Sequence, residues 1–252
     1  MTDILEVERV TKRFFGVAAV DDVSFAVGEG ELLSIIGPNG SGKTTLFNVI
    51  TGFMRADHGR IRFRANDITS WPAHTIARHG LVRTFQDVRL FASLSTLENL
   101  RLAVQQHQEE DLIGRFLWSP RVRRLERAAT DRATALLAEF GLSAHRDVPA
   151  GLLSYGQRKL LEFAIAIMPE PAVLLLDEPA AAVNPTMIHT LKGHIVAYHQ
   201  AGHTVVLIEH NMSVVMDISQ RVLVLDSGRL IAAGSPEVVR ADPLVLEAYF
   251  GR

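Results

Sequence analysis

The sequence predicts an α/β fold built on a largely parallel sheet, and two patterns in the chain support this prediction. Short runs made almost wholly of apolar residues are typical of strands buried on both faces, because they lack the alternation of a half-exposed sheet. Apolar residues at helical spacing lie between these runs, as the crossover connections of a parallel sheet require. The strand runs are residues 32–36, 173–176, 205–208 and 222–225, and the helical patterns include residues 45–51 and 160–168.

Length and composition limit the chain to one main core. A chain of 252 residues is long enough for one α/β domain with a modest subdomain, but too short for two independent enzymes. Hydrophobic residues make up 48% and charged residues 21%, which excludes a chiefly disordered chain. The 26 basic and 28 acidic residues nearly cancel, so we expect no nucleic-acid partner. Cysteine is absent, which excludes disulfides, thiolate metal sites and cysteine nucleophiles.

The first part of the chain has shorter strands than the core. Apolar and polar residues alternate more regularly there, as in a sheet with one exposed face, so we expect an amino-terminal antiparallel β flap. Its predicted strands are residues 4–10, 23–27 and 61–63.

A helical subdomain is expected after the flap. Strand runs are missing from this stretch, and the helical pattern of residues 128–140 stops at Gly141, a residue typical of helix ends. We therefore divide the single domain, residues 1–252, into an α/β core with its β flap (1–86 and 154–252) and an inserted helical subdomain (87–153).

A glycine-rich loop follows the first buried strand and matches the G-x-x-x-x-G-K-[ST] pattern of a phosphate-binding loop. Its residues are Gly37, Pro38, Asn39, Gly40, Ser41, Gly42, Lys43 and Thr44. Glycines let backbone N–H groups approach phosphate oxygens, and the next helix directs the positive end of its dipole at them. Lys43 is expected to reach the β- and γ-phosphates, and Thr44 to offer its hydroxyl to Mg²⁺. The loop lacks the glycine spacing of a dinucleotide fingerprint, so the sequence predicts a P-loop NTPase core.

Two adjacent acids, Asp177 and Glu178, end the buried run at residues 173–176. Ligands bind at this end of the strands in open α/β sheets. Asp177 suits coordination of Mg²⁺, and Glu178 suits the base that orients and polarises an attacking water. A solvated turn is the alternative for an isolated Asp-Glu-Pro, but the phosphate loop earlier in the chain favours the catalytic interpretation.

A second candidate phosphate-binding element precedes the helix that we expect to begin near Arg158. Its residues are Ser154, Tyr155, Gly156 and Gln157. Backbone N–H groups at Ser154 and Gly156 could face an anion at the amino end of that helix. An ordinary serine helix cap is the alternative.

The order of these motifs resembles that of the ATP-binding subunits of ABC transporters, over nearly the whole chain. The order is the phosphate loop, Gln86, the Ser154–Gln157 element about twenty residues before the acidic pair, and His210 after the strand run 205–208. The resemblance implies that residues 37–45, Thr45 included, form the Walker A loop, that Asp177 ends Walker B and that Glu178 is the catalytic glutamate. It also implies that Ser154–Gln157 is the family signature.

Three further residues take roles from the same resemblance. Gln86 matches the glutamine that contacts Mg²⁺ and water and signals to the membrane subunits, His210 matches the histidine that contacts the γ-phosphate, and Phe14 takes the place of the aromatic that stacks on adenine. Each has a simpler alternative: a loop amide for Gln86, a surface histidine beside Glu209 for His210, and a core ring for Phe14, with its neighbour Phe15 as the stacking residue.

The resemblance implies ATP and Mg²⁺ as ligands and a composite site, with ATP between Walker A of one subunit and the signature of another, identical or related, subunit. It further implies permease partners, an indirect solute-binding protein partner, and a cytoplasmic location on the inner face of the membrane. The charged start of the sequence, with Asp3 and Glu6, does not resemble a secretory signal.

Details of the motifs indicate a subfamily. The signature has Tyr155 where glycine is commonest in the family, and Asn184 stands where many members have aspartate. Together with the tail 241–249, these features look like ATPases of branched-chain amino acid importers. The alternatives are an ABC ATPase for another solute, a soluble ABC-type ATPase acting on DNA or ribosomes, and a P-loop kinase or GTPase, which has no use for the signature or His210.

Overall fold

The computed structural model describes residues 2–85, 88–105 and 120–250. The chain forms two compact units, residues 1–86 with 172–252, and residues 87–171. Residues 154–171, expected from the sequence to belong to the α/β core, lie in the second unit instead.

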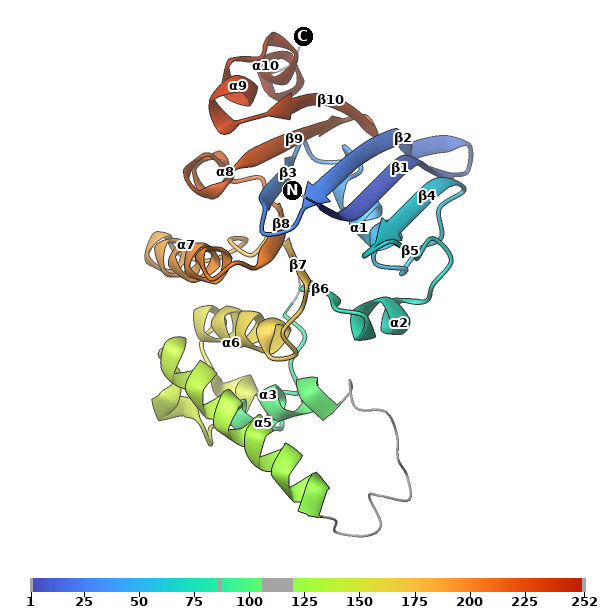
Figure 1. The fold of residues 1–252 in the computed structure, drawn as a ribbon. Helices are drawn as coiled ribbons and strands as arrows, with labels where there is room; N and C mark the ends of the chain where they lie inside the picture. Colours follow the sequence, from blue (N-terminus) through green and yellow to red (C-terminus); the bar gives the residue numbers. More distant parts are fainter. Residues whose placement is uncertain (1, 86–87, 106–119, 251–252) are drawn as a thin grey trace. The chain divides into compact units, whose positions relative to one another are not determined.

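The first unit contains a six-stranded sheet in the order β10-β9-β3-β8-β7-β6 (Figure 1). All neighbouring pairs from β9 to β6 are parallel, and β10 is antiparallel to β9. The strands are β3 (Leu32–Ile36), β6 (Leu81–Arg83), β7 (Val173–Asp177), β8 (Thr204–Ile208), β9 (Arg221–Asp226) and β10 (Arg229–Gly234). Every residue of β3, β7 and β8 is buried, which confirms the prediction of a mainly parallel sheet covered on both faces.

Helices cover both faces of this sheet. They are α1 (Lys43–Ile50), α2 (Ala73–Arg78), α7 (Pro185–Gln200), α8 (Met212–Ile218), α9 (Pro236–Ala241) and α10 (Pro243–Phe250). Side chains of β9 alternate between two cores, as the period of a strand dictates. Leu223 and Leu225 pack in the larger core with Phe47 of α1, whereas Val222 and Val224 pack in the smaller core with α8 and α9.

A four-stranded antiparallel sheet in the order β2-β1-β4-β5 forms the predicted β flap (Figure 1). Its strands are β1 (Asp3–Phe14), β2 (Val17–Gly28), β4 (His58–Phe63) and β5 (Asn66–Asp67). The strands β1 and β2 are longer than the sequence analysis expected. Arg9 and Asp22 have positive φ, and the register shifts beside Val10, so the alternation that marks a strand in sequence is broken midway.

The second unit is helical. It contains α3 (Thr96–Gln105), α5 (Pro120–Glu139) and α6 (Tyr155–Ile167), with the short 3₁₀ helices η1 (Ser143–His145) and η2 (Ala150–Leu152). The helices α3, α5 and α6 pack on one another, and the rings of Phe140 and Phe163 meet edge to face with 5.4 Å between centroids. Arg132 of α5 also donates from Nε to the carbonyl oxygen of Met168, 2.9 Å away. These contacts explain why the segment that follows the signature belongs to this unit.

Within the described ranges, no helix combines the length and the apolar character needed to cross a bilayer.

Candidate functional site

The phosphate loop connects β3 to α1, and its conformation depends on glycine at two positions. Gly37 and Gly42 have φ of +152° and +102°. A Cβ atom on Gly37 would lie 2.0 Å from the carbonyl oxygen of Leu225, and one on Gly42 would lie 2.1 Å from that of Ala19. Any side chain would therefore collide with backbone, and the loop keeps the close-wrapped path that a phosphate cradle needs.

The side chain of Lys43 lies inside this loop. Its Nζ donates to the carbonyl oxygens of Gly37 and Pro38 at 2.8 and 2.9 Å, and to Oγ of Ser41 at 3.3 Å. Burial lowers the pKa of Lys43, while the nearby carboxylates of Glu178 and Asp177 act in the opposite direction. The predicted cation and the two predicted acids therefore share one electrostatic environment.

The remaining loop residues surround this cation. Asn39 and Gly40 are exposed, and the N–H of Ser41 donates to the carbonyl oxygen of Pro38 at 3.1 Å. Thr44, the predicted Mg²⁺ ligand, is exposed in the first turn of α1, and Thr45 is half-buried. The hydroxyl of Thr44 is thus accessible at the amino end of a helix, where anions and their counterions bind.

Asp177 is the last residue of β7, and its carboxylate forms an ion pair that the sequence analysis did not anticipate. Its Oδ2 accepts from Nη2 of Arg83, the last residue of β6, at 2.6 Å. Nη1 of Arg83 donates to Oδ1 of Asn48 on α1 at 2.7 Å, and the guanidinium lies over the rings of Phe47 and Phe85. The parallel pairing of β6 with β7 brings the two charged residues together.

Glu178 and His210 meet across the ends of two neighbouring strands. Oε2 of Glu178, which follows β7, lies 3.6 Å from Nδ1 of His210, which follows β8. The Glu178 side chain is 16% exposed and that of His210 is 55% exposed. The backbone of Glu178 has a positive φ of 48°, a conformation that glutamate rarely adopts. Such strain at a candidate base is the kind that clusters at functional sites.

Glu209 is a third acidic residue at this edge of the sheet, and the sequence predicts no role for it beyond its place beside His210. It is completely buried. Its carboxylate accepts hydrogen bonds from the backbone N–H groups of Ala180, His210 and Asn211. In the sequence, the one signal for this residue is its position directly after the apolar run 205–208, whereas its hydrogen bond to Ala180 depends on the pairing of β7 with β8.

The signature residues form the amino end of α6. Oγ of Ser154 accepts from the N–H of Gln157 at 3.3 Å, and Oε1 of Gln157 accepts from the N–H of Ser154 at 2.9 Å, which makes a capping box. This cap starts the helix at Tyr155, three residues before the expected start. Tyr155 is exposed beside the cations of Arg158 and Lys159, and Gly156 is half-buried. The role of these residues toward a nucleotide stays a prediction.

The other predicted site residues lie as follows. Phe14 ends β1, half-exposed, with Nζ of Lys12 5.7 Å from its ring centroid, and Phe15 is fully exposed in the turn that follows. Gln86 lies outside the described residues. Asn184, where the family often has aspartate, caps α7 by accepting from the N–H of Met187 at 2.9 Å. The amide keeps the capping function of an acid at this position.

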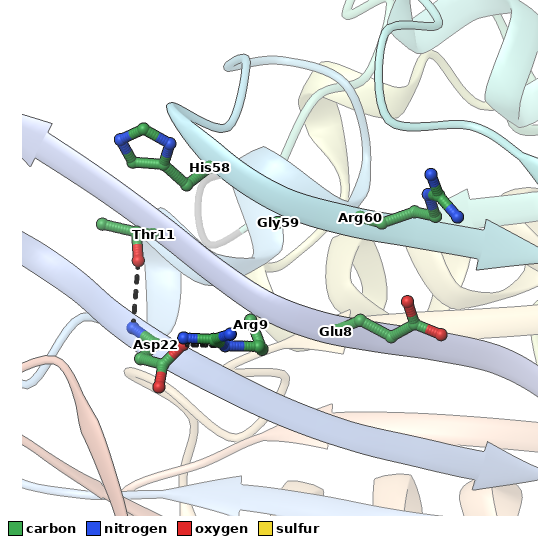
Figure 2. Close-up of a pocket in the computed structure, with 7 residues that line it drawn as sticks. All are labelled: Glu8, Arg9, Thr11, Asp22, His58, Gly59 and Arg60. Atoms are coloured by element: carbon green, nitrogen blue, oxygen red, sulfur yellow. Dashed lines mark hydrogen bonds and ion pairs between the residues drawn. The ribbon is translucent and has the colours of Figure 1, made fainter.

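A hollow of about 650 Å³ opens elsewhere, on the β flap (Figure 2). It is lined by Glu8, Arg9, Thr11, Asp22, His58, Gly59 and Arg60. None of the predicted site residues within the described ranges lines it. Its charges are of both signs, and Nε of Arg9 pairs with Oδ1 of Asp22 at 3.0 Å, so the hollow does not resemble a phosphate site.

The residues present fit a nucleoside triphosphate and its magnesium ion. The loop has two positions that exclude a Cβ and a lysine ammonium group, and Asp177 and Thr44 supply hard oxygen donors. In the part of the chain that the structure describes, no three His, Cys, Asp or Glu side chains gather as a metal centre. A magnesium ion held largely by phosphates and water needs only one or two protein oxygens.

Comparison with known proteins gives consistent matches. The ABC transporter family model matches residues 20–181, and the branched-chain amino acid ATP-binding cassette transporter model matches residues 229–252. The chain is 44% identical over 250 residues to BraF, a high-affinity branched-chain amino acid transport ATP-binding protein of Pseudomonas aeruginosa, covering 98% of each chain. It is 41% identical over 250 residues to LivG of Escherichia coli K12, a protein of the same description, again covering 98% of each.

Solved structures match over the full length. A nucleotide-free ATP-binding cassette from an ABC transporter has a TM-score of 0.86 and 36% identity, and a cassette solved in its ADP conformation has a TM-score of 0.86 and 37% identity. Both comparisons cover 100% of each chain. The helical insertion and the antiparallel flap are therefore part of a known architecture.

Proposed function

This chain belongs to the family of ABC transporter ATP-binding subunits, and from that premise we propose that it hydrolyses ATP as the motor of an importer for branched-chain amino acids. The solute is inferred from the relatives, which are described as branched-chain amino acid transport proteins, and from the match of residues 229–252. One structural observation supports the chemistry most. The carboxyl ends of β3, β8 and β7, which are neighbours in the sheet, carry the phosphate loop, His210 and the Asp177–Glu178 pair.

The phosphate loop binds the triphosphate. Its backbone N–H groups and the amino end of α1 attract the phosphate oxygens. Lys43 exchanges its hydrogen bonds to the loop carbonyls for bonds to the β- and γ-phosphates. Phe14, exposed at the end of β1, offers a ring on which adenine stacks.

Glu178 acts as the general base in hydrolysis. Its carboxylate accepts a proton from a water molecule whose oxygen attacks the γ-phosphorus, while the bond to the β-phosphate oxygen breaks and ADP leaves with inorganic phosphate as the second product. His210, 3.6 Å from Glu178, donates to a γ-phosphate oxygen and limits the positions open to that water. The two residues thus orient the nucleophile and the reacting phosphate together.

Magnesium is the expected metal. When bound, Mg²⁺ neutralises charge on the phosphate oxygens. Thr44, Asp177 and Gln86 are the residues that would hold it, directly or through water. Arg83 donates to one oxygen of Asp177 at 2.6 Å, and this bond fixes the orientation of the carboxylate.

Partners complete the proposal. The signature Ser154–Gln157 is proposed to contact ATP held by a second ATPase subunit, and Gln86 is proposed to transmit the state of the nucleotide to permease subunits. A solute-binding protein is an indirect partner. We place the complex on the inner face of the cell membrane, with this chain on the cytoplasmic side.

Two measurements test the proposal. The purified chain is expected to release phosphate from ATP in the presence of Mg²⁺, and Glu178→Gln is expected to lose this activity. In a host strain that lacks the gene, uptake of radiolabelled leucine is expected to return with the wild-type gene but not with Glu178→Gln. Restored uptake of another solute, with leucine uptake unaffected by the gene, would replace branched-chain amino acids by that solute.

A further inference from the structure

Glu209 is an acidic residue that the proposed mechanism does not use, although it lies at the centre of the site. It directly follows β8, and its exposed fraction is 0%. Oε1 accepts from the N–H of Ala180 at 2.8 Å, and Oε2 accepts from the N–H groups of His210 and Asn211, both at 3.1 Å. One side chain therefore contacts two separate segments of backbone.

These hydrogen bonds replace the ion pair that a buried carboxylate usually needs. Among the described residues, no lysine or arginine forms a salt bridge with Glu209. Burial raises its pKa, and the three backbone donors and the neighbouring His210 oppose that effect. A fully buried carboxylate is costly, and here three backbone N–H groups and the neighbouring His210 compensate for its burial.

The two segments that Glu209 joins carry the two residues of the proposed hydrolysis step. Ala180 is two residues after Glu178, and His210 follows Glu209 directly. The N–H of Glu178 also donates to the carbonyl oxygen of Ile208 at 2.9 Å, so the segments are connected on both sides of the Glu178 side chain. Removing one connection would leave the strained backbone of Glu178 free to relax, because its positive φ persists only where surrounding contacts fix it.

We infer that Glu209 is a positioning residue, which holds Glu178 and His210 at their mutual distance for the hydrolysis step by bonding to the backbone of both loops. Its completely buried side chain offers no exposed surface to a nucleotide or a metal ion. The inference rests on the proposed ATPase function and adds a residue to it. We expect loss of Glu209 to slow the chemical step and to leave ATP binding intact, because the phosphate loop follows a different strand.

Glutamine at this position tests the inference with little change in size. An amide has one acceptor oxygen, so its NH₂ group must face either the N–H of Ala180 or those of His210 and Asn211. Glu209→Gln therefore loses its hydrogen bonds to the backbone of at least one of the two segments. Glu31→Gln is a matched control, because Glu31 is also a largely buried carboxylate that accepts from a backbone N–H, that of Gly28, but it precedes β3 at the opposite end of the sheet.

Steady-state ATP hydrolysis and binding of a fluorescent ATP analogue are measured for the full chain and for both variants. We expect Glu209→Gln to lower kcat at least tenfold, with KM and the dissociation constant of the analogue changed less than about threefold. Glu31→Gln is expected to keep the wild-type kcat. Unchanged kcat in Glu209→Gln, or an equal loss in Glu31→Gln, would overturn the inference.

Amide hydrogen exchange supplies a readout that a merely structural role would not produce. Glu209→Gln is expected to accelerate exchange in peptides covering 178–182, 209–211 or both, according to which backbone N–H groups lose their acceptor, while peptides covering β3 keep their protection. Acceleration in neither segment, or acceleration spread over the whole unit, contradicts the inference. If the glutamine variant does not fold, Glu209→Asp takes its place, since its shorter side chain cannot span both segments and the same outcomes apply.

The Glu178→Gln variant separates failure of the inference from failure of the proposed function. Wild-type hydrolysis no faster than that of Glu178→Gln would refute the ATPase function itself. Wild-type hydrolysis well above that background, together with an unaltered Glu209→Gln, would refute only the positioning role.

Discussion

The guanidinium of Arg83 and the carboxylate of Asp177 form a buried ion pair, with 2.6 Å between Nη2 and Oδ2 and side chains only 4% and 3% exposed. Arg83 ends β6 and Asp177 ends β7, so the pair links the carboxyl ends of two adjacent strands. The same guanidinium donates to Asn48 of α1 at 2.7 Å. The orientation of the predicted metal ligand is therefore fixed by the sheet edge and by the helix that follows the phosphate loop.

Removal of Arg83 is predicted to destabilise the protein strongly. In Arg83→Leu the carboxylate of Asp177 stays buried without its cation, and breaking a buried pair in this way costs about 3–5 kcal/mol. The matched control is Arg9→Leu, which removes the cation of the exposed pair with Asp22 and is expected to cost less than about 1 kcal/mol. Urea unfolding curves of the two variants measure the difference, and equal losses would contradict the prediction.

The core strands were predictable because burial on both faces leaves a clear sequence pattern. β3 has the predicted bounds, 32–36, and β7 extends the predicted run 173–176 by Asp177 alone. β6 was not predicted, since it has three residues and ends with the charged Arg83. Such a strand exists because it pairs with β7, and no pattern within three residues reveals a partner about ninety positions away.

The candidate site was predictable where chemistry is carried by contiguous residues. The phosphate loop and the Asp177–Glu178 pair are local motifs, and their placement at strand ends follows from the fold class. Arg83 and Glu209 were not predicted, because the role of each side chain depends on its burial and on the order of the strands. The position of Glu209, directly after an apolar run at the same sheet edge, is the one signal that could have indicated it.

Loss of the Lys43 cation is predicted to weaken ATP binding. The ammonium group lies within the phosphate loop, and a hydrogen bond to a charged group contributes about 1.5–3 kcal/mol, so Lys43→Ala should raise the dissociation constant about ten- to a hundredfold. Lys192→Ala is the control, because Lys192 pairs with Asp217 on the helices α7 and α8. Isothermal titration with ATP and Mg²⁺ measures both, and unchanged affinity in Lys43→Ala would remove this residue from the phosphate site.

Replacement of Glu178 by glutamine is predicted to separate binding from hydrolysis. The amide keeps the shape of the side chain but accepts no proton, and loss of a general base lowers a rate about 10²- to 10⁴-fold. ATP affinity should change less than about twofold, since the phosphate loop is intact. Glu237→Gln, at the exposed start of α9, serves as the control with expected wild-type activity. Phosphate release and nucleotide titration measure the two quantities, and parallel loss of both would contradict the assigned role.

The last prediction concerns the pH dependence of stability that Glu209 confers. Burial raises its pKa in the folded chain, so between the ordinary pKa of glutamate and the raised value the folded state binds more protons than the unfolded state. The free energy of unfolding must then fall as pH rises through this window. Its contribution is complete below the ordinary pKa and is lost above the raised one.

Glu209→Gln cannot titrate at this position, so the difference in unfolding free energy, wild type minus variant, isolates the contribution of Glu209. His210 and Glu178, the neighbouring titratable groups, are present in both proteins, and their effects largely cancel. Urea unfolding is measured in a pH series that begins below the ordinary glutamate pKa of about 4.3 and ends near neutrality. We expect the difference to be greatest at the acidic end and to decline with rising pH. A difference that grows with pH would mean that the three backbone donors outweigh burial and that the folded chain lowers the pKa of Glu209.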